Sequence, residues 1–108
     1  MSRQKGRDVA DYRLPLRGEI DLATARALLR ELQRAIESSR ANVVVDCTDV
    51  TFIDSTGMYV LLHTRRALER DGRQMHIVNA GDKQRRAFEV IGQSDVLSEG
   101  FGLERMRI

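Results

Sequence analysis

The chain has 108 residues, a common size for a single globular domain, and its 42% hydrophobic content is enough for a core. No apolar stretch approaches the roughly 20 residues that cross a bilayer, so no membrane association is expected. The net charge is only +2, and the arginines are spread along the chain among a similar number of acids, which argues against nucleic-acid binding.

The N-terminal part begins with polar residues 1–8, which we expect to be a flexible segment, followed by one domain over residues 9–108. Apolar residues alternate in part between Val9 and Ile20, which predicts a strand. Pro15 cannot donate a hydrogen bond to a neighbouring strand, so this strand should lie at a sheet edge or carry a bulge, and Gly18 is a second candidate irregularity.

The clearest helix is predicted from Leu22 to Ser38, preceded by Asp21 as its N-cap. Its apolar residues recur at steps of three and four, as expected for one buried face: Leu22, Ala25, Leu28, Leu29, Leu32 and Ile36. The opposite face carries arginine and other polar residues.

A second strand is predicted at Val43–Val45, apolar on both faces as in the centre of a parallel or mixed sheet. A polar turn should follow it and end at Asp54, before a second helix from about Thr56 to Glu69.

In the C-terminal part, the residue pattern predicts a strand over Gln74–Asn79. It then predicts a helix that begins at Gly81-Asp82 and ends at Gly92. Residues 93–108 are less regular, with a short final helical turn expected over 102–106. Strands and helices that alternate along a chain indicate an α/β domain. We therefore expect a mixed, partly parallel sheet of four to five strands with three to four helices.

The segment Asp54-Ser55-Thr56-Gly57 places a hydroxyl at the N-terminus of the second helix, where free N–H groups and the helix dipole favour negative charge. A serine before a helix is commonly only a cap. Here Asp54 can cap the helix instead, which would leave the Ser55 hydroxyl pointing outward. Gly57 has no side chain and would let another molecule approach the backbone.

Two separated motifs resemble those of the STAS domain, in particular those of bacterial anti-sigma factor antagonists. One is the segment 43–62, with Asp46, Phe52-Ile53 and the Asp54–Gly57 motif. The other is Gly18-Glu19-Ile20-Asp21-Leu22-Ala23-Thr24-Ala25, and the resemblance covers about residues 9 to 101. It implies a single STAS-like domain.

The resemblance also implies a mechanism. The unmodified protein would bind an anti-sigma factor with serine-kinase activity, and a sigma factor would be released. Phosphorylation of Ser55 would abolish the binding, and a metal-dependent serine phosphatase would reverse it. The residues implied to border the partner contact are Asp21, Asp54, Ser55, Thr56, Gly57 and Met58. A monomer or weak dimer is expected.

The charges agree with a loss of binding on phosphorylation, because a phosphate on Ser55 would add negative charge beside the candidate neighbours Asp21, Asp46 and Asp54. Two of these acids have structural alternatives: Asp21 as a helix cap, and Asp46 as an acceptor for N–H groups of a turn. Of the adjacent pair Met58 and Tyr59, one should face outward, and either could anchor a partner.

The remaining chemistry-bearing residues have structural explanations. His63 and His76 lack further ligands at metal-binding spacing, and Cys47 is expected to be an inert buried thiol in a reducing, cytoplasmic compartment. Arginines 65, 66, 70, 73, 85 and 86 are expected on solvated helix faces. No catalytic pair, metal site or cofactor is indicated, so the chain is not expected to be an enzyme. The alternative is a STAS module that senses a nucleotide or lipid, or scaffolds a signalling assembly.

Overall fold

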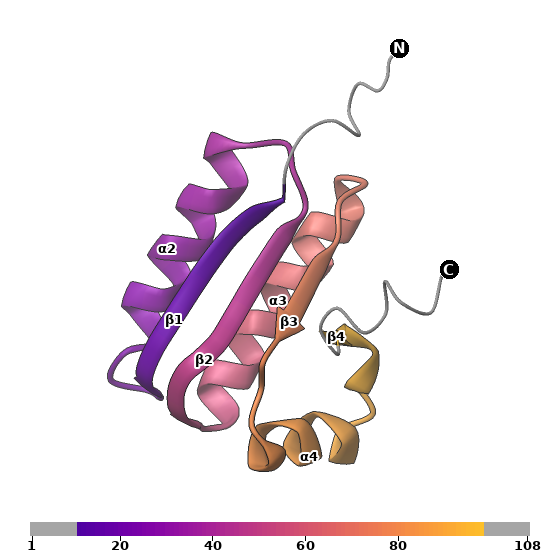
Figure 1. The fold of residues 1–108 in the computed structure, drawn as a ribbon. Coiled ribbons are helices and arrows are strands. Elements are labelled where there is room, and N and C mark those ends of the chain that lie inside the picture. The colour runs from indigo at the N-terminus through magenta and orange to yellow at the C-terminus, as the bar shows by residue number, and fades with distance from the viewer. Residues whose placement is uncertain (1–10, 99–108) are drawn as a thin grey trace.

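The structure is a computed structural model that describes residues 11–98. Strands and helices alternate along these residues (Figure 1). In chain order they are β1 (Tyr12–Ile20), α2 (Ala25–Ser38), β2 (Val43–Ile53), α3 (Ser55–Arg70), β3 (Met75–Val78), α4 (Asp82–Val90), the 3-10 turn η1 (Ser94–Val96) and β4 (Leu97–Ser98). The expectations for residues 1–8 and 102–106 lie outside the described residues.

The four described strands form one sheet in the order β1-β2-β3-β4. Every pair in it is parallel, because a helix or helical segment returns the chain after each strand. The expected α/β fold is thereby confirmed, with strand and helix numbers inside the expected range, and no antiparallel pair occurs within residues 11–98.

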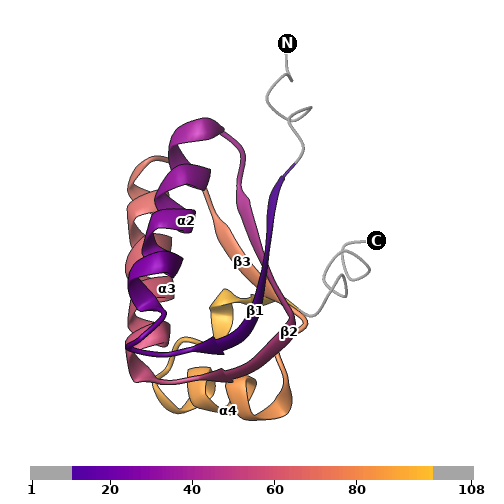
Figure 2. The ribbon, with the colours of Figure 1, turned by 90° about the vertical axis from the view of Figure 1, so that its left-hand side faces the viewer.

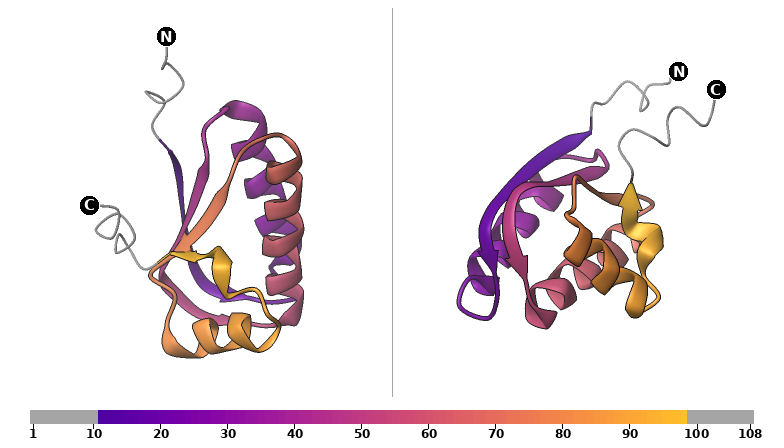
Figure 3. Two further views of the ribbon diagram at one scale, coloured as in Figure 1. Left: turned by 90° about the vertical axis from the view of Figure 1, so that its right-hand side faces the viewer. Right: turned by 60° about the horizontal axis from the view of Figure 1, so that its bottom comes forward.

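One face of the sheet is covered by α2 and α3, which lie side by side (Figure 2), while α4 lies across its lower end in Figure 3. Leu14, Val45 and Ile77 are register partners across β1, β2 and β3, and all three are buried. The helices oppose them with Leu32 and Leu61, both fully buried. Burial of each such side chain contributes roughly 1.5–3 kcal/mol, so this layer holds the helices against the sheet.

The first strand has both irregularities that its sequence predicts. Within the described sheet, β1 lies at an edge, and its register with β2 shifts between Pro15 and Arg17 and again between Gly18 and Glu19. Gly18 has a φ of 76°, a conformation that glycine adopts without strain.

Two predicted boundaries are wrong. The helix expected from Leu22 begins at Ala25, and Leu22 lies in a preceding turn with 76% of its surface exposed. The polar turn expected after Val45 is instead a continuation of β2 to Ile53, which pairs with Ile20. Pairing with a distant strand therefore overrides the local polarity of residues 46–52.

No helix of the described residues is long and apolar enough to cross a membrane.

Candidate functional site at the start of α3

The Asp54–Gly57 motif lies where β2 passes into α3, at the carboxyl edge of the sheet. Ile53, the last residue of β2, pairs with Ile20, the last residue of β1. The next residue, Asp54, donates its backbone N–H to the carbonyl oxygen of Ile20 at 3.0 Å. The start of α3 is thus joined to the end of β1, where Asp21 follows.

Asp54 is the N-cap of α3. Its φ and ψ of −97° and −176° are extended, and its Oδ1 accepts a hydrogen bond from the Gly57 backbone N–H at 2.9 Å. Its carbonyl oxygen accepts the first helical bond, from Met58 N–H, at 3.0 Å. The cap is therefore supplied by the residue before Ser55, as the sequence suggested.

The Ser55 side chain holds no other described residue in place. Ser55 is exposed, and its hydroxyl takes part in none of the hydrogen bonds of residues 11–98. It stands at the first position of a helix of 16 residues, where backbone N–H groups still lack helical acceptors. A hydroxyl here can react or bind without breaking a contact that holds the fold.

Gly57 has a different role from the expected one. A Cβ built on it would lie 2.6 Å from Ile20 Cγ2 and 2.8 Å from the Ile20 carbonyl oxygen. Gly57 is buried, so the space left by its missing side chain is filled by β1 of the same chain rather than left for another molecule. Gly57 positions the start of α3.

The adjacent pair Met58 and Tyr59 divides between core and surface. Met58 belongs to the hydrophobic core with 8% of its surface exposed, whereas Tyr59 is 65% exposed. The Tyr59 ring stacks on that of His63, with centroids 5.7 Å apart and planes 19° from parallel. Tyr59 is therefore the outward-facing candidate of the two, and Thr56 is half-buried.

Asp21 caps the turn that leads into α2. Its Oδ1 accepts a hydrogen bond from the Thr24 backbone N–H at 3.1 Å, and its own N–H donates to Thr24 Oγ1 at 2.9 Å. This reciprocal pair has the geometry of a capping box, placed one turn before the regular helix. Because Ile20 pairs with Ile53, Asp21 also lies at the sheet edge that carries Asp54, so both interpretations of Asp21 remain compatible with the structure.

Asp46 does not join this acidic edge. It pairs in register with Pro15 and Val78, and the strand from it to Ile53 is roughly 20 Å long. Its carboxylate accepts hydrogen bonds from Asn79 Nδ2, from Thr48 and from Arg13, which hold its pKa well below the ordinary value. The expectation that Asp46 neighbours the phosphate position is wrong, because β2 continues as a strand beyond it.

Cys47 is buried, and burial followed by the charge of Asp46 raises its pKa to about 12. A thiol with such a pKa remains protonated near neutral pH, as expected of an inert cysteine.

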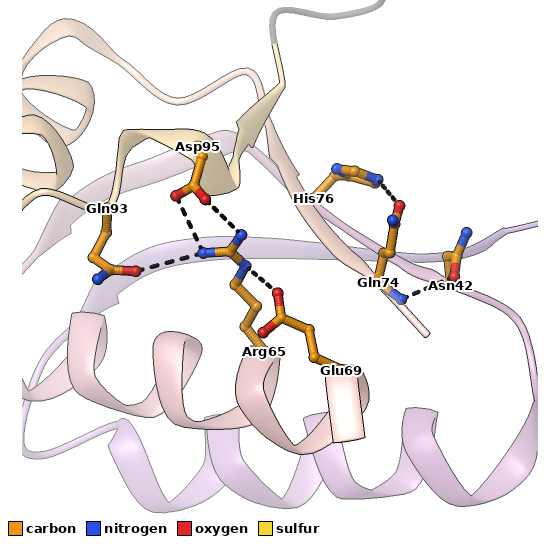
Figure 4. Close-up of polar contacts among 7 residues, drawn as sticks. All are labelled: Asn42, Arg65, Glu69, Gln74, His76, Gln93 and Asp95. Atoms are coloured by element: carbon orange, nitrogen blue, oxygen red, sulfur yellow. Dashed lines mark hydrogen bonds and ion pairs between the residues drawn. The ribbon is translucent and has the colours of Figure 1, made fainter. Parts of the chain in front are cut away.

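Arg65 is not on a solvated face, contrary to the expectation from sequence. Its side chain is only 16% exposed and binds Asp95, with Nη2 and Oδ2 3.0 Å apart, and Glu69, with Nε and Oε2 3.1 Å apart (Figure 4). The bond to Asp95 raises the pKa of Arg65 and lowers that of Asp95. This network ties α3 to the segment before β4.

Arg73, also expected on a solvated face, is buried. It donates to the carbonyl oxygens of Ser39 and, at 3.2 Å, Ile36, and it pairs with Asp71 at 3.0 Å. Arg73 therefore supplies hydrogen-bond donors to carbonyl oxygens at the carboxyl end of α2. His76 is half-buried, and its ring nitrogen lies 3.2 Å from Gln74 Oε1 (Figure 4).

Leu22 was expected on the buried face of the helix but is exposed. The sequence left open which of Met58 and Tyr59 faces outward. The spacing favours Tyr59, because it lies four residues after Ser55 and so on the same side of the helix. The exposure of Leu22 could not be predicted from spacing, since it follows from the turn made by Asp21 and Thr24.

Known proteins share this fold. A solved structure of the anti-sigma factor antagonist SpoIIAA in its unphosphorylated form is 21% identical with a TM-score of 0.71, covering 92% of this chain and 91% of that one. The phosphorylated form of the Bacillus cell fate determinant SpoIIAA is 19% identical with a TM-score of 0.65, covering 87% and 88% of the two chains.

Sequence comparison agrees with these structural matches. The anti-sigma-B factor antagonist of Staphylococcus aureus (strain NCTC 8325 / PS 47) is 27% identical over 93 residues, which cover 86% of this chain and 86% of that protein. The family model for the STAS domain matches residues 4–104. That match spans nearly the whole sequence and confirms the resemblance seen in the two motifs: the chain belongs to the STAS domain family.

Proposed function

We propose that this protein is an anti-sigma factor antagonist controlled by phosphorylation of Ser55. In its unphosphorylated form it binds an anti-sigma factor that is also a serine kinase, and a sigma factor is released. The kinase transfers the γ-phosphoryl group of ATP to Ser55 Oγ, the hydroxyl proton is lost and ADP leaves. A metal-dependent serine phosphatase reverses the modification, and the circuit operates in the cytoplasm. The similarity to a staphylococcal anti-sigma-B factor antagonist supports this assignment.

The observation that carries the proposal is that Asp54, and not Ser55, caps the N-terminus of α3. Asp54 holds the helix N-terminus through Gly57 N–H, while the Ser55 hydroxyl is exposed and without a hydrogen bond among the described residues. A kinase can therefore reach the acceptor oxygen without unfolding the cap.

The fold tolerates the product for the same reason. A phosphate at the first position of α3 faces the positive end of the helix dipole, which stabilises it by roughly 0.3–1 kcal/mol at an exposed site. The complex with the partner responds differently. A phosphoserine brings about −1.5 to −2 charges to an edge that already carries Asp21 and Asp54. A loss of only about 2.7 kcal/mol weakens binding a hundredfold, so this added charge is enough without refolding.

In this proposal the chain is the substrate of an enzyme and not an enzyme itself. The two carboxylates near Ser55 serve as a cap and in a turn, and the described cysteine is buried with a raised pKa.

The test uses the serine-kinase anti-sigma factors of the organism that encodes this chain, each purified separately. The protein is incubated with each kinase and ATP, and the modified residue is mapped by mass spectrometry. Dissociation constants of the unmodified and Ser55-phosphorylated forms are then measured with the same kinase. We expect phosphorylation at Ser55 alone and at least about a hundredfold weaker binding afterwards.

Two variants and a control sharpen the result. Ser55→Ala should bind and never be released by ATP, whereas Ser55→Asp should bind weakly. Ser38→Ala, an exposed serine at the other end of the helix layer, should behave as wild type. Equal affinity of the two phosphorylation states would overturn the proposal. Tight binding of a nucleotide or lipid without any kinase partner would favour a sensing module instead.

A further inference from the structure

The outer surface of the helix layer contains an apolar groove between α2 and α3. It is open to solvent, has a volume of about 390 Å³ and is lined by Leu22, Ala25, Arg26, Leu29 and Val60. Both helices begin at the carboxyl edge of the sheet and run in the same direction (Figure 1), so the groove lies between their N-terminal halves.

The groove is continuous with the Ser55 edge. Ser55, Tyr59 and His63 follow one another at four-residue steps and are all exposed, which places them on one stripe of α3. Val60 lies beside this stripe and lines the groove, less than two turns, or roughly 8 Å, from Ser55. On the other side, Leu22 directly follows Asp21.

Two large side chains at this end of the groove are exposed. Leu22 is 76% and Tyr59 65% accessible, and the ring of Tyr59 is held by its stack on His63. Single exposed apolar residues are ordinary on a protein surface. Here Leu22 lines an apolar groove, and Tyr59 directly precedes Val60, which also lines it. An aromatic ring that is already oriented loses little conformational entropy when a partner covers it.

The rim of the groove is positively charged. Arg26 lines it, and the exposed Arg30 follows one turn later on α2. Neither of these two arginines forms an ion pair with another described residue. Glu31 lines a hollow between α2 and β1, and Glu69 pairs with Arg65. Asp21 and Asp54 lie at the Ser55 edge, where Asp21 accepts the Thr24 N–H and Asp54 accepts the Gly57 N–H.

We infer that this groove binds an acidic amphipathic helix of the anti-sigma kinase; the inference rests on the function proposed above. Apolar side chains of that helix fill the space between Leu29 and Val60, and its carboxylates meet Arg26 and Arg30. A helix that lays its apolar face in a groove between two others is a common mode of recognition.

The sign of the charge follows from the switch. A basic segment beside Ser55 would bind more tightly after phosphorylation, because the phosphate would supply a counter-ion. An acidic segment is attracted by the arginines and repelled by the phosphate. With an acidic occupant, the same modification therefore weakens the complex.

The test compares charge and contact variants against the kinase identified above. Arg26→Glu and Tyr59→Ala should each weaken binding at least about tenfold. Arg40→Glu, an exposed arginine in the turn between α2 and β2 without a described ion pair, makes the same charge change away from the groove and should stay within about twofold of wild type. Binding of the wild type should also weaken with salt more steeply than that of Arg26→Glu.

Phosphorylation kinetics provide an independent readout. A docking residue lost from the groove should raise KM for this protein as a substrate and leave kcat unchanged. The acidic residues of the kinase can then be changed to arginine one at a time. One such change should restore binding of Arg26→Glu, and thermal unfolding of each variant checks that its fold is intact.

Each result bears on a different proposal. Wild-type binding by Arg26→Glu and Tyr59→Ala, while Ser55 phosphorylation still dissociates the complex, would overturn the groove and leave the proposed function standing. If no serine-kinase anti-sigma factor binds or phosphorylates the wild type, the proposed function fails and this inference with it.

Discussion

Gly57 is packed against Ile20 so closely that no larger residue fits. An added Cβ would stand 2.6 Å from Ile20 Cγ2, 2.8 Å from Ile20 O and 3.1 Å from Ile53 Cγ2. Two of these three atoms belong to β1 and one to β2, so the contact brings the first turn of α3 onto the ends of both strands. The position of Ser55 at the edge of the sheet depends on this contact.

Gly57→Ala should therefore destabilise the protein by about 1–3 kcal/mol, even though alanine favours helix more than glycine by about 1 kcal/mol. The clash is with backbone and branched side chains, which cannot move aside easily. Urea unfolding measures the loss. Gly81→Ala is a matched control, because its Cβ would meet only the mobile end of Gln84 and should cost less.

Asp54→Ala should cost about 0.5–2 kcal/mol, since the Gly57 N–H loses its acceptor at the N-terminus of α3. Asp54→Asn keeps an oxygen for this bond and should retain most of the stability. Chemical denaturation of the two variants separates the contribution of the capping hydrogen bond to stability from that of the carboxylate charge. A loss of equal size in both would show that the carboxylate charge, and not the hydrogen bond, stabilises the helix.

Arg73→Met should destabilise by about 1–3 kcal/mol, because the carbonyl oxygens of Ile36 and Ser39 lose a buried donor. Arg70→Met removes an exposed arginine from the same region and should change stability by no more than about 0.5 kcal/mol. Thermal unfolding compares the two. Similar melting temperatures would show that water replaces the guanidinium at the end of α2.

Asp46 should contribute an acid-sensitive part of the stability. Its hydrogen bonds with Asn79 and Thr48, and its pairing with Arg13, lower its pKa in the folded state. A depressed carboxyl pKa stabilises the fold fully above the unfolded value of about 3.9, and this stabilisation is lost as pH falls through the folded pKa.

The measurement is the free energy of unfolding of wild type and Asp46→Asn as a function of pH. The advantage of the wild type should be constant near neutral pH and shrink below about pH 4. Asp49→Asn, an exposed acid on the same strand, is the control. An advantage that persists unchanged at low pH would contradict the stabilising role of the carboxylate.

The alternation of elements and the cap of α3 were predictable because both depend on neighbours in sequence. Leu28 and Leu32 fall at helical spacing, and Asp54 binds the N–H of a residue three positions later. The two sequence motifs also sufficed to indicate the STAS family, which the family model confirms.

Contacts between distant segments were not predictable. The polar residues after Val45 form strand because β1 offers them hydrogen-bonding partners, and this moves Asp46 away from Ser55. Arg73 is buried only because α2 ends beside it. The reason for Gly57 is likewise the approach of Ile20.

The amino-acid sequence by itself determined the order of strands and helices from β1 to α4, the family, and a hydroxyl with a capping acid before it, since all of these follow from local spacing. Tertiary structure decided which acids stand beside that hydroxyl, that Arg73 is buried, and that Leu22 lines an open apolar groove while Tyr59 is exposed. The physical reason is that exposure and charge proximity depend on parallel pairing and helix packing, which join residues far apart in the chain.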